Sequence, residues 1–202
     1  MPARVVVLAG PSGSGKSRLA ERLGYPILRL DDFYRDGDDP ELPRLPIGVV
    51  DWDDPRSWDS AAAMDAMESL CRSGRADVPV YDIAMDRRTG GQVLDLAGAP
   101  LFVAEGVFAP HIVADCRDRG LLAAAICLRR PRLLTFGLRL LRDLREHRKP
   151  PWVLWRRGLL LYRREPVIVA DAIRLGCRPM SLRQAEAYVR TLAGPGQAPS
   201  AA

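Results

Sequence analysis

Short apolar runs that alternate with polar segments set the pattern of this chain. Runs of valine, leucine, isoleucine and alanine occur at residues 4–9, 101–104 and 121–128, and a further short run occurs at 25–30. Continuous apolar runs of this length are typical of strands that are buried on both faces of a parallel sheet. With a last strand expected at 172–175, the pattern predicts an α/β fold whose central parallel sheet has about five strands flanked by helices.

The segments between these runs predict a hairpin, a loop and helices. Residues 78–82 and 92–96 look extended and flank the turn sequence Thr89-Gly90-Gly91, so a β-hairpin is expected there. Residues 35–50 are rich in aspartate, proline and glycine, which predicts a loop. Helices are predicted at residues 16–23, 58–71, 131–146, 152–162 and 181–192. The last of these opens on a capping-box sequence.

The stretch between the first strand and the first helix matches a phosphate-binding loop. Its sequence Gly-Pro-Ser-Gly-Ser-Gly-Lys-Ser fits G-x-x-x-x-G-K-[ST], in which backbone N–H groups and a helix N-terminus hold phosphate oxygens. Lys16 is expected to reach the β- and γ-phosphates, and the Ser17 hydroxyl to bind Mg²⁺. The motif therefore predicts a P-loop NTPase fold with ATP and Mg²⁺ as cofactors. The expected nucleotide-binding residues are Gly10, Pro11, Ser12, Gly13, Ser14, Gly15, Lys16, Ser17 and Arg18.

Carboxylates follow two of the predicted strands. Ligands of open parallel sheets bind beyond the carboxyl ends of the strands, so Asp31 and Asp32 lie where a general base for an acceptor hydroxyl is needed. Neighbouring side chains of an extended segment point to opposite faces, so we expect one catalytic and one supporting aspartate. A helix cap or a turn is the alternative. Glu105, at the end of another strand, is placed to help order Mg²⁺ or its waters.

Arginines concentrate in the segment that follows residue 128. Arg139 and Arg142 are three residues apart and share a helix face, from which they can converge on phosphates and stabilise transferring charge. We therefore expect an arginine-rich helical lid over about residues 131–158. The alternative is a solvated helical surface with charge pairs such as Arg142–Glu146.

Composition narrows the class of protein. The 202 residues fit one domain, expected over residues 1–193, and the Gly/Pro/Ala/Ser-rich residues 194–202 are expected to be disordered. The net charge of +5 allows a nucleic-acid partner, but aspartates near the expected acceptor site would repel a phosphate backbone. No apolar run approaches the roughly 20 residues of a membrane span, and no signal peptide is evident. The four cysteines form no C-x-x-C pair, so a cytoplasmic location without zinc or disulfides is expected.

The ordered motifs resemble the uridine/cytidine kinase family of P-loop small-molecule kinases over about residues 4–190. The family's Asp-Ser-Phe-Tyr is similar to Asp-Asp-Phe-Tyr here, which implies Asp31 as the base and Tyr34 near the substrate. Its Asn-Phe-Asp-His-Pro segment is similar to Asp-Trp-Asp-Asp-Pro, which implies that Asp53 binds ribose hydroxyls. Its Pro-x-Tyr-Asp strand is similar to Pro-Val-Tyr-Asp, which implies that Tyr81 lies at the nucleoside.

The resemblance extends to the metal side and the lid, and it weakens at the hairpin. The family's Glu-Gly is similar to the sequence at Glu105, and its Arg-x-x-Arg-Asp to the sequence at Arg139 and Arg142. Family members that read uracil or cytosine carry a histidine where this chain has Asp86, and an aromatic residue where it has Ile83. The resemblance therefore supports the phosphoryl-transfer residues better than the base-reading ones.

The resemblance implies an ATP-dependent kinase that phosphorylates a hydroxyl of a uridine- or cytidine-like nucleoside or a related metabolite. Its expected substrate-binding residues are Asp31, Tyr34, Asp53, Tyr81 and Asp86, and its expected catalytic residues are Asp31, Lys16, Arg139 and Arg142. Two alternatives stay open: a kinase for another small alcohol such as pantothenate or a sugar, and a nucleotide-binding switch without kinase activity. The expected partner is the small acceptor, and a homo-oligomer is a further open alternative.

Overall fold

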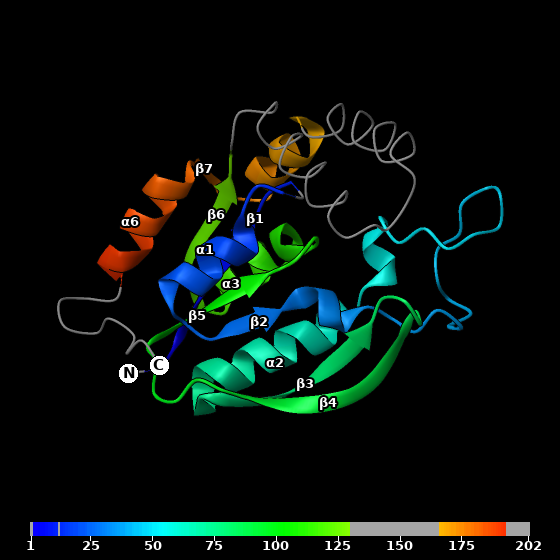
Figure 1. Ribbon diagram of the computed structural model, residues 1–202, viewed down its shortest axis with the longest axis horizontal. Helices are drawn as coiled ribbons and strands as arrows, with labels where there is room; N and C mark the ends of the chain where they lie inside the picture. Colours follow the sequence, from blue (N-terminus) through cyan, green and yellow to red (C-terminus); the bar gives the residue numbers. More distant parts are fainter. Residues whose placement is uncertain (1, 12, 130–165, 193–202) are drawn as a thin grey trace.

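A parallel sheet forms the centre of the computed structural model, which describes residues 2–11, 13–129 and 166–192 (Figure 1). The strand order is β2-β5-β1-β6-β7, and each neighbouring pair runs parallel. This confirms the predicted sheet of about five strands. The strands are β1 (Arg4–Ala9), β2 (Ile27–Arg29), β5 (Leu101–Glu105), β6 (Leu122–Leu128) and β7 (Arg178–Met180).

Helices cover both faces of the sheet, and a two-stranded ribbon lies outside it (Figure 1). Buried residues of α2 and α3 pack on one face of the sheet, and those of α1 and α6 pack on the other. Strands β3 and β4 form the predicted antiparallel hairpin, and β3 packs against α2. These elements are α1 (Lys16–Leu23), α2 (Ser60–Ser73), α3 (Val113–Asp118), α6 (Leu182–Leu192), β3 (Arg75–Asp82) and β4 (Arg87–Asp95).

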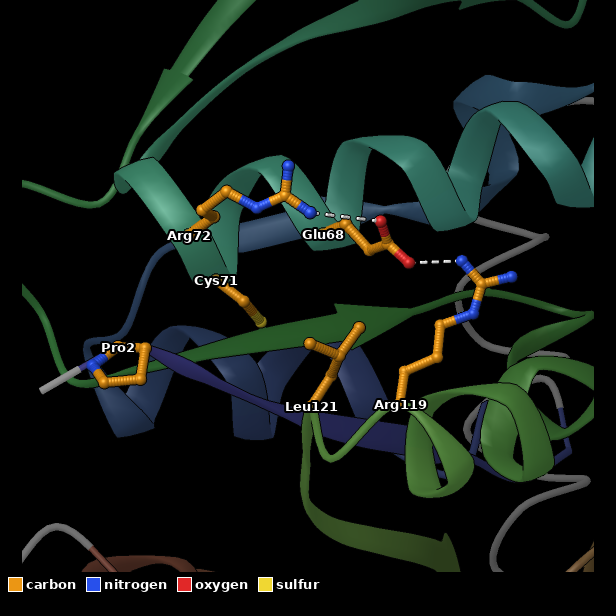
Figure 2. A pocket seen from close by; sticks show the side chains of 6 residues that line it. All are labelled: Pro2, Glu68, Cys71, Arg72, Arg119 and Leu121. Atoms are coloured by element: carbon orange, nitrogen blue, oxygen red, sulfur yellow. Dashed lines mark hydrogen bonds and ion pairs between the residues drawn. The ribbon is translucent and has the colours of Figure 1, made fainter.

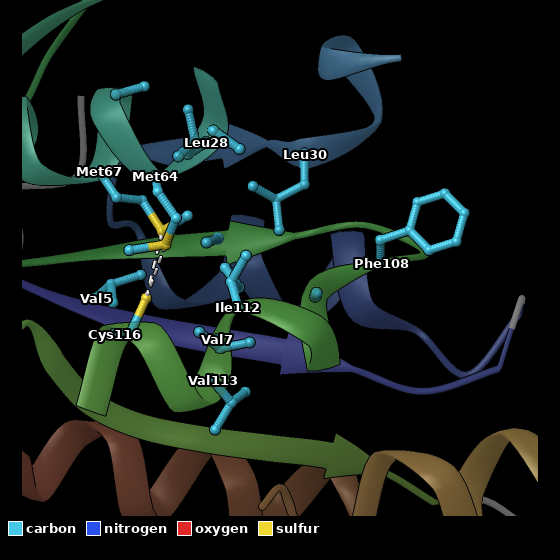
Figure 3. Packing of buried hydrophobic residues seen from close by; sticks show 14 of the residues in the cluster. Val5, Val7, Leu28, Leu30, Met64, Met67, Phe108, Ile112, Val113 and Cys116 are labelled. Atoms are coloured by element: carbon cyan, nitrogen blue, oxygen red, sulfur yellow. Dashed lines mark hydrogen bonds between the residues drawn. The ribbon is translucent and has the colours of Figure 1, made fainter. Parts of the chain in front are cut away.

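The central strand β1 divides the apolar core into two parts. Its side chains alternate, so Val5 and Val7 enter one cluster while Val6 and Leu8 enter the other. All four are fully buried, which explains the continuous apolar run in the sequence. Figure 3 shows the first cluster, in which residues of β1 pack with residues of α2 and α3, and Cys116 of α3 contacts Met64 and Met67 of α2. Apolar side chains therefore pack on both faces of the sheet.

Side chains fix the starts of two helices. Asp59 precedes α2, and its Oδ1 accepts a hydrogen bond from the backbone N–H of Ala62 at 3.0 Å. Helix α2 therefore begins at Ser60, two residues after the predicted start. The capping box predicted for α6 is confirmed: the backbone N–H of Gln184 donates to the Ser181 hydroxyl at 3.4 Å, and the Ser181 N–H donates to the Gln184 side chain at 2.9 Å.

The strand predicted at residues 172–175 is wrong. Residues 166–174 are helical, and the last strand among the described residues is β7, which begins at Arg178. Ala172 is buried in the core while Ile173 beside it is 41% exposed, a one-sided burial that fits a surface helix. The four residues Ala-Ile-Arg-Leu, three of which are apolar, do not by themselves distinguish a strand from part of a helix.

The turn predicted at Thr89-Gly90-Gly91 is also wrong, because these residues lie within β4. The chain reverses at residues 83–86 instead. The Asp82 carboxylate accepts hydrogen bonds from the backbone N–H groups of Ala84 (2.8 Å) and Met85 (3.3 Å), which is the local side-chain bonding that starts a turn. Asp86 completes the turn with a φ of 48°. The hairpin strands are consequently longer than predicted.

Several predicted features lie outside the described residues. These are Ser12, the helices at 131–146 and 152–162, the lid at about 131–158, and the tail at 194–202. Within the described ranges, no helix combines the length and apolar character that a membrane span requires.

Candidate active site

The phosphate loop joins β1 to α1 at the carboxyl edge of the sheet. Gly10 has a φ of 133°, and a Cβ placed on it would lie 2.8 Å from the carbonyl oxygen of Leu128 in β6. Only glycine therefore fits where the loop leaves the strand. The Lys16 ammonium turns back over the loop, where its Nζ donates to the carbonyl oxygens of Gly10 at 2.9 Å and Pro11 at 3.4 Å.

The loop has groups that suit a bound phosphate. Ser14 is fully buried, and its hydroxyl has no hydrogen-bond partner among the described residues. Gly15, the N-cap of α1, supplies no side-chain hydrogen bond to the first turn, which also contains no acidic residue. An anion there would accept hydrogen bonds from the helix N-terminus. The loop residues therefore fit the phosphates of ATP; the predicted residue Arg18 is exposed on the same helix.

A hydroxyl and a carboxylate lie together beside the loop. The Ser17 hydroxyl donates to Glu105 Oε1 at 3.1 Å, and Glu105 is the last residue of β5, the strand adjacent to β1. A hydroxyl and a carboxylate are ligands that suit Mg²⁺, which usually keeps several waters and binds through one or two carboxylates and phosphates. No group of three or more acidic, histidine or cysteine residues that could hold a metal is found in the part of the chain that the structure describes.

Asp31 lies in a 3₁₀ helix, not in the extended segment that the sequence predicted. This helix, η1 (Leu30–Phe33), follows β2 and buries Leu30 and Phe33. Asp31 Oδ1 accepts a hydrogen bond from the backbone N–H of Val107 at 2.8 Å. A Cβ on Gly106 would lie 2.7 Å from the same carboxylate oxygen, so the two segments are in close contact. Asp31 is thereby tied to the residues that follow Glu105.

Asp32 has a different environment from its neighbour. Burial raises the pKa of its carboxyl group, whereas the Arg29 guanidinium and a hydrogen bond from the Tyr81 backbone lower it. Arg29 Nε lies 3.8 Å from Asp32 Oδ2. The two aspartates therefore face different surroundings because of the helical geometry of η1 rather than strand alternation. The assignment of one catalytic and one supporting aspartate stays a prediction.

Four aromatic rings form a wall next to Asp31. The Tyr34 ring lies 5.7 Å from the Trp52 ring, and 5.8 Å from each of the Tyr81 and Phe108 rings, measured between centroids. The Tyr34 hydroxyl donates to the Trp52 carbonyl at 3.3 Å, and the Tyr81 hydroxyl donates to the Arg35 carbonyl at 3.2 Å. Sequence reasoning identified the two tyrosines but missed Phe108, whose position three residues after Glu105 was the available signal.

Both tyrosines stay neutral near pH 7. Burial raises the pKa of Tyr34, and the nearby carboxylates of Asp31 and Asp53 raise it further. Burial also raises the pKa of Tyr81 to about 12, with a contribution from Asp86. These tyrosines can exchange hydrogen bonds with a ligand but do not act as bases. Of the five predicted substrate-binding residues, Tyr34 and Tyr81 belong to the aromatic wall, and the carboxylates of Asp31, Asp53 and Asp86 are near enough to raise the pKa of one or other tyrosine. The predicted catalytic residues Arg139 and Arg142 lie outside the described residues.

A hollow of about 280 Å³ lies elsewhere on the molecule (Figure 2). Pro2 and Leu121, which line it, precede β1 and β6, so it lies at the amino ends of the strands, opposite the phosphate loop. Glu68 is ion-paired there to both Arg72 and Arg119. The hollow is therefore separate from the phosphate site.

The phosphate loop and the parallel sheet define a P-loop fold. A solved structure of a candidate fructose transport system kinase from Silicibacter sp. TM1040 superimposes with a TM-score of 0.59 at 20% identity, covering 89% of this chain and 88% of that one. At this identity the likeness supports the fold alone.

Sequence relatives with curated names narrow the class of P-loop protein that this chain resembles. A uridine kinase of Schizosaccharomyces pombe is 30% identical over 148 residues, which are 70% of this chain and 32% of that protein. The inorganic pyrophosphatase TTM1 of Arabidopsis thaliana is 30% identical over 112 residues, 52% of this chain and 16% of that protein. A uridine kinase of Bacillus pumilus is 26% identical over 149 residues, 70% of this chain and 68% of that protein.

The chain thus spans only 32% and 16% of the first two relatives. No family model matches it. The two uridine kinases support a place in the uridine kinase-like family of P-loop kinases, in agreement with the motifs. Relatives that are named uridine kinase support the assignment of this chain to the small-molecule kinases.

If Glu105 and Ser17 hold Mg²⁺, replacing Glu105 with glutamine should raise the Mg²⁺ concentration needed for half-maximal activity on the order of tenfold or more. Glutamine keeps an oxygen that can accept the Ser17 hydrogen bond of 3.1 Å, but it removes the charge that attracts the cation. Nucleotide-dependent turnover measured across a Mg²⁺ titration checks this. An unchanged midpoint would exclude Glu105 from the metal site.

Proposed function

We propose that this protein is an ATP-dependent phosphotransferase that phosphorylates a hydroxyl group of a nucleoside or a similar small metabolite. The observation that carries the proposal is the segment from Glu105 to Val107. Glu105 contacts Ser17 of the phosphate loop, and the Val107 N–H holds Asp31 on the acceptor side. One three-residue segment therefore joins the proposed metal ligands to the proposed base.

The phosphate loop, the acceptor-side residues and the lid arginines have different roles in this proposal. Mg²⁺·ATP supplies the phosphoryl group, and the loop N–H groups and Lys16 hold its phosphates. Asp31 takes the proton from the acceptor hydroxyl as the hydroxyl oxygen bonds to the γ-phosphorus, the bond from that phosphorus to the β–γ bridging oxygen breaks, and ADP leaves. Tyr34 and Tyr81 position the acceptor, which agrees with the neutral state of both phenols. Arg139 and Arg142 are proposed to close over the phosphates.

The hairpin turn at Asp86 bears on which acceptor the protein takes. Asp86 adopts a φ of 48°, a region in which Asn, Asp and His are enriched among non-glycine residues, so the turn tolerates either the family's histidine or this aspartate. An aspartate accepts hydrogen bonds, so it favours an acceptor that presents an amino or imino group. This difference also favours a second candidate function, a kinase for another small alcohol such as pantothenate or a sugar. A cytoplasmic location and a homo-oligomeric state stay predictions.

The test is to incubate the purified full chain with Mg²⁺·ATP and a panel of nucleosides, pantothenate and sugars, and to detect phosphorylated product by mass. We expect a monophosphate from at least one nucleoside, with none when Mg²⁺ is chelated. Product from pantothenate or a sugar alone would support the second candidate function. ATP binding without product from any acceptor would contradict both and favour a nucleotide-binding switch.

A further inference from the structure

The tip of the β3–β4 hairpin is attached to the segment that carries Tyr34. The backbone N–H of Gly37 donates to the Asp86 carbonyl at 2.6 Å, and the backbone N–H of Arg88 donates to Asp36 Oδ1 at 2.7 Å. A Cβ on Gly37 would lie 2.9 Å from the Asp86 Cβ, so the approach requires glycine. The hairpin is therefore fixed against residues 36 and 37 at its turn.

The Arg88 side chain adds a second attachment. Its Nε donates to the Tyr34 carbonyl at 3.3 Å, and its Nη2 lies 3.2 Å from Asp59 Oδ2. Asp59 uses its other oxygen to accept from Ala62 N–H at the start of α2. One planar guanidinium thus joins the hairpin, the Tyr34 backbone and a helix N-terminus. A lysine, with a single ammonium group, does not reproduce this fork geometry.

We propose that Arg88 is a positioning residue for the acceptor, and this inference rests on the proposed function. It acts through Tyr34 and Tyr81, whose rings lie 5.8 Å apart. Tyr81 belongs to β3 and Tyr34 follows η1, so their spacing depends on the attachment between the hairpin and the Tyr34 segment. Arg88 contributes its backbone N–H and its guanidinium to that attachment, beside the Gly37–Asp86 hydrogen bond and the one from the Tyr81 hydroxyl to the Arg35 carbonyl. It has no described contact with the phosphate loop.

The kinetic test compares Arg88→Ala with Arg87→Ala. Arg87 is the adjacent arginine of β4, and its guanidinium has no hydrogen-bond or ion-pair partner among the described residues. We expect Arg88→Ala to raise KM for the acceptor on the order of tenfold, the effect of losing a charge-assisted hydrogen bond, with KM for ATP within about twofold. Arg88→Lys should lie between wild type and alanine. Equal acceptor KM values for Arg88→Ala and Arg87→Ala would overturn the proposal.

Asp59→Asn provides a second variant. Asparagine caps helices about as well as aspartate, so α2 keeps its start while the ion pair to Arg88 is lost. It should raise the acceptor KM in the same direction as Arg88→Ala but by less. No change in acceptor KM would contradict a role for the ion pair.

Amide hydrogen exchange separates this inference from the proposed function. In the full chain without substrates, Arg88→Ala should exchange faster than Arg87→Ala at Gly37 and along β4. If wild type phosphorylates no acceptor, the proposed function fails, and exchange still tests the attachment. Unchanged exchange would overturn the attachment, and faster exchange with an unchanged acceptor KM would overturn the positioning role.

Discussion

Asp31→Asn should lower kcat by about 10²- to 10⁴-fold while leaving ATP binding unchanged. Asparagine has the shape of aspartate, and its side-chain oxygen can still accept the 2.8 Å hydrogen bond from Val107 N–H. The contact between η1 and the residues after Glu105 is therefore kept. What is lost is the ability to take a proton from the acceptor hydroxyl. Steady-state turnover and calorimetric measurement of ATP affinity check the two halves of this result.

The adjacent carboxylate is the matched control for this variant. Asp32 is half-buried near Arg29 and accepts from the Tyr81 backbone, so Asp32→Asn should reduce turnover much less than Asp31→Asn. If the two variants lose turnover equally, a unique role for Asp31 is refuted. Turnover near the wild-type value in Asp31→Asn would remove Asp31 from the mechanism.

Lys16→Met should lower turnover on the order of 10²- to 10³-fold and weaken nucleotide binding as well. Methionine approximates the length of the lysine stem but has no ammonium group. The hydrogen bonds at 2.9 Å and 3.4 Å to the Gly10 and Pro11 carbonyls show that this ammonium lies within the loop. The loop loses these two hydrogen bonds, but the buried residues Leu19, Ala20 and Leu23 still hold α1 in the core, so the fold should be kept.

Equilibrium binding of ATP and measurement of kcat, with thermal unfolding as a check on folding, test this prediction. Arg22→Met is the control, because Arg22 is a cation in the last turn of the same helix and pairs with Glu186 at 2.7 Å, far along the helix from the loop. It should bind ATP as wild type does. Wild-type ATP affinity and turnover in Lys16→Met would refute the phosphate role of the loop lysine.

The sequence predicted local features well because their signals are local. The continuous buried run of β1, the glycine loop and the capping box at Ser181 each depend on residues within a few positions of one another. The pairings that build the site are not local. Ser17 and Glu105 are 88 residues apart, and Asp31 and Val107 are 76 apart. Only the rule that parallel strands end at one edge brought Asp31 and Glu105 together in the prediction.

The failures have identifiable physical causes. The mainly apolar segment at 172–175 is too short to show a period, and the one-sided burial of Ala172 fits a helix. At the hairpin, the turn was predicted from the glycines at 90 and 91. The turn instead forms at residues 83–86, where the Asp82 carboxylate accepts two backbone hydrogen bonds. The sequence analysis did not predict helix α3, because its six residues make fewer than two turns and a repeating apolar pattern cannot show over that length. The docking of Arg88 on Tyr34 and Asp59 has no sequence signature.

The hairpin is a separate two-stranded sheet, with no strand shared with the parallel sheet that carries the phosphate loop. Two of the residues that would recognise the acceptor, Tyr81 and Asp86, therefore belong to a different structural unit from the phosphate loop. Mutations in β3, β4 or their turn can accumulate without disturbing the hydrogen bonds of the parallel strands. Under the proposed function, such a chain can alter the part of acceptor recognition that Tyr81 and Asp86 supply through divergence of the hairpin, while its phosphate chemistry is inherited unchanged.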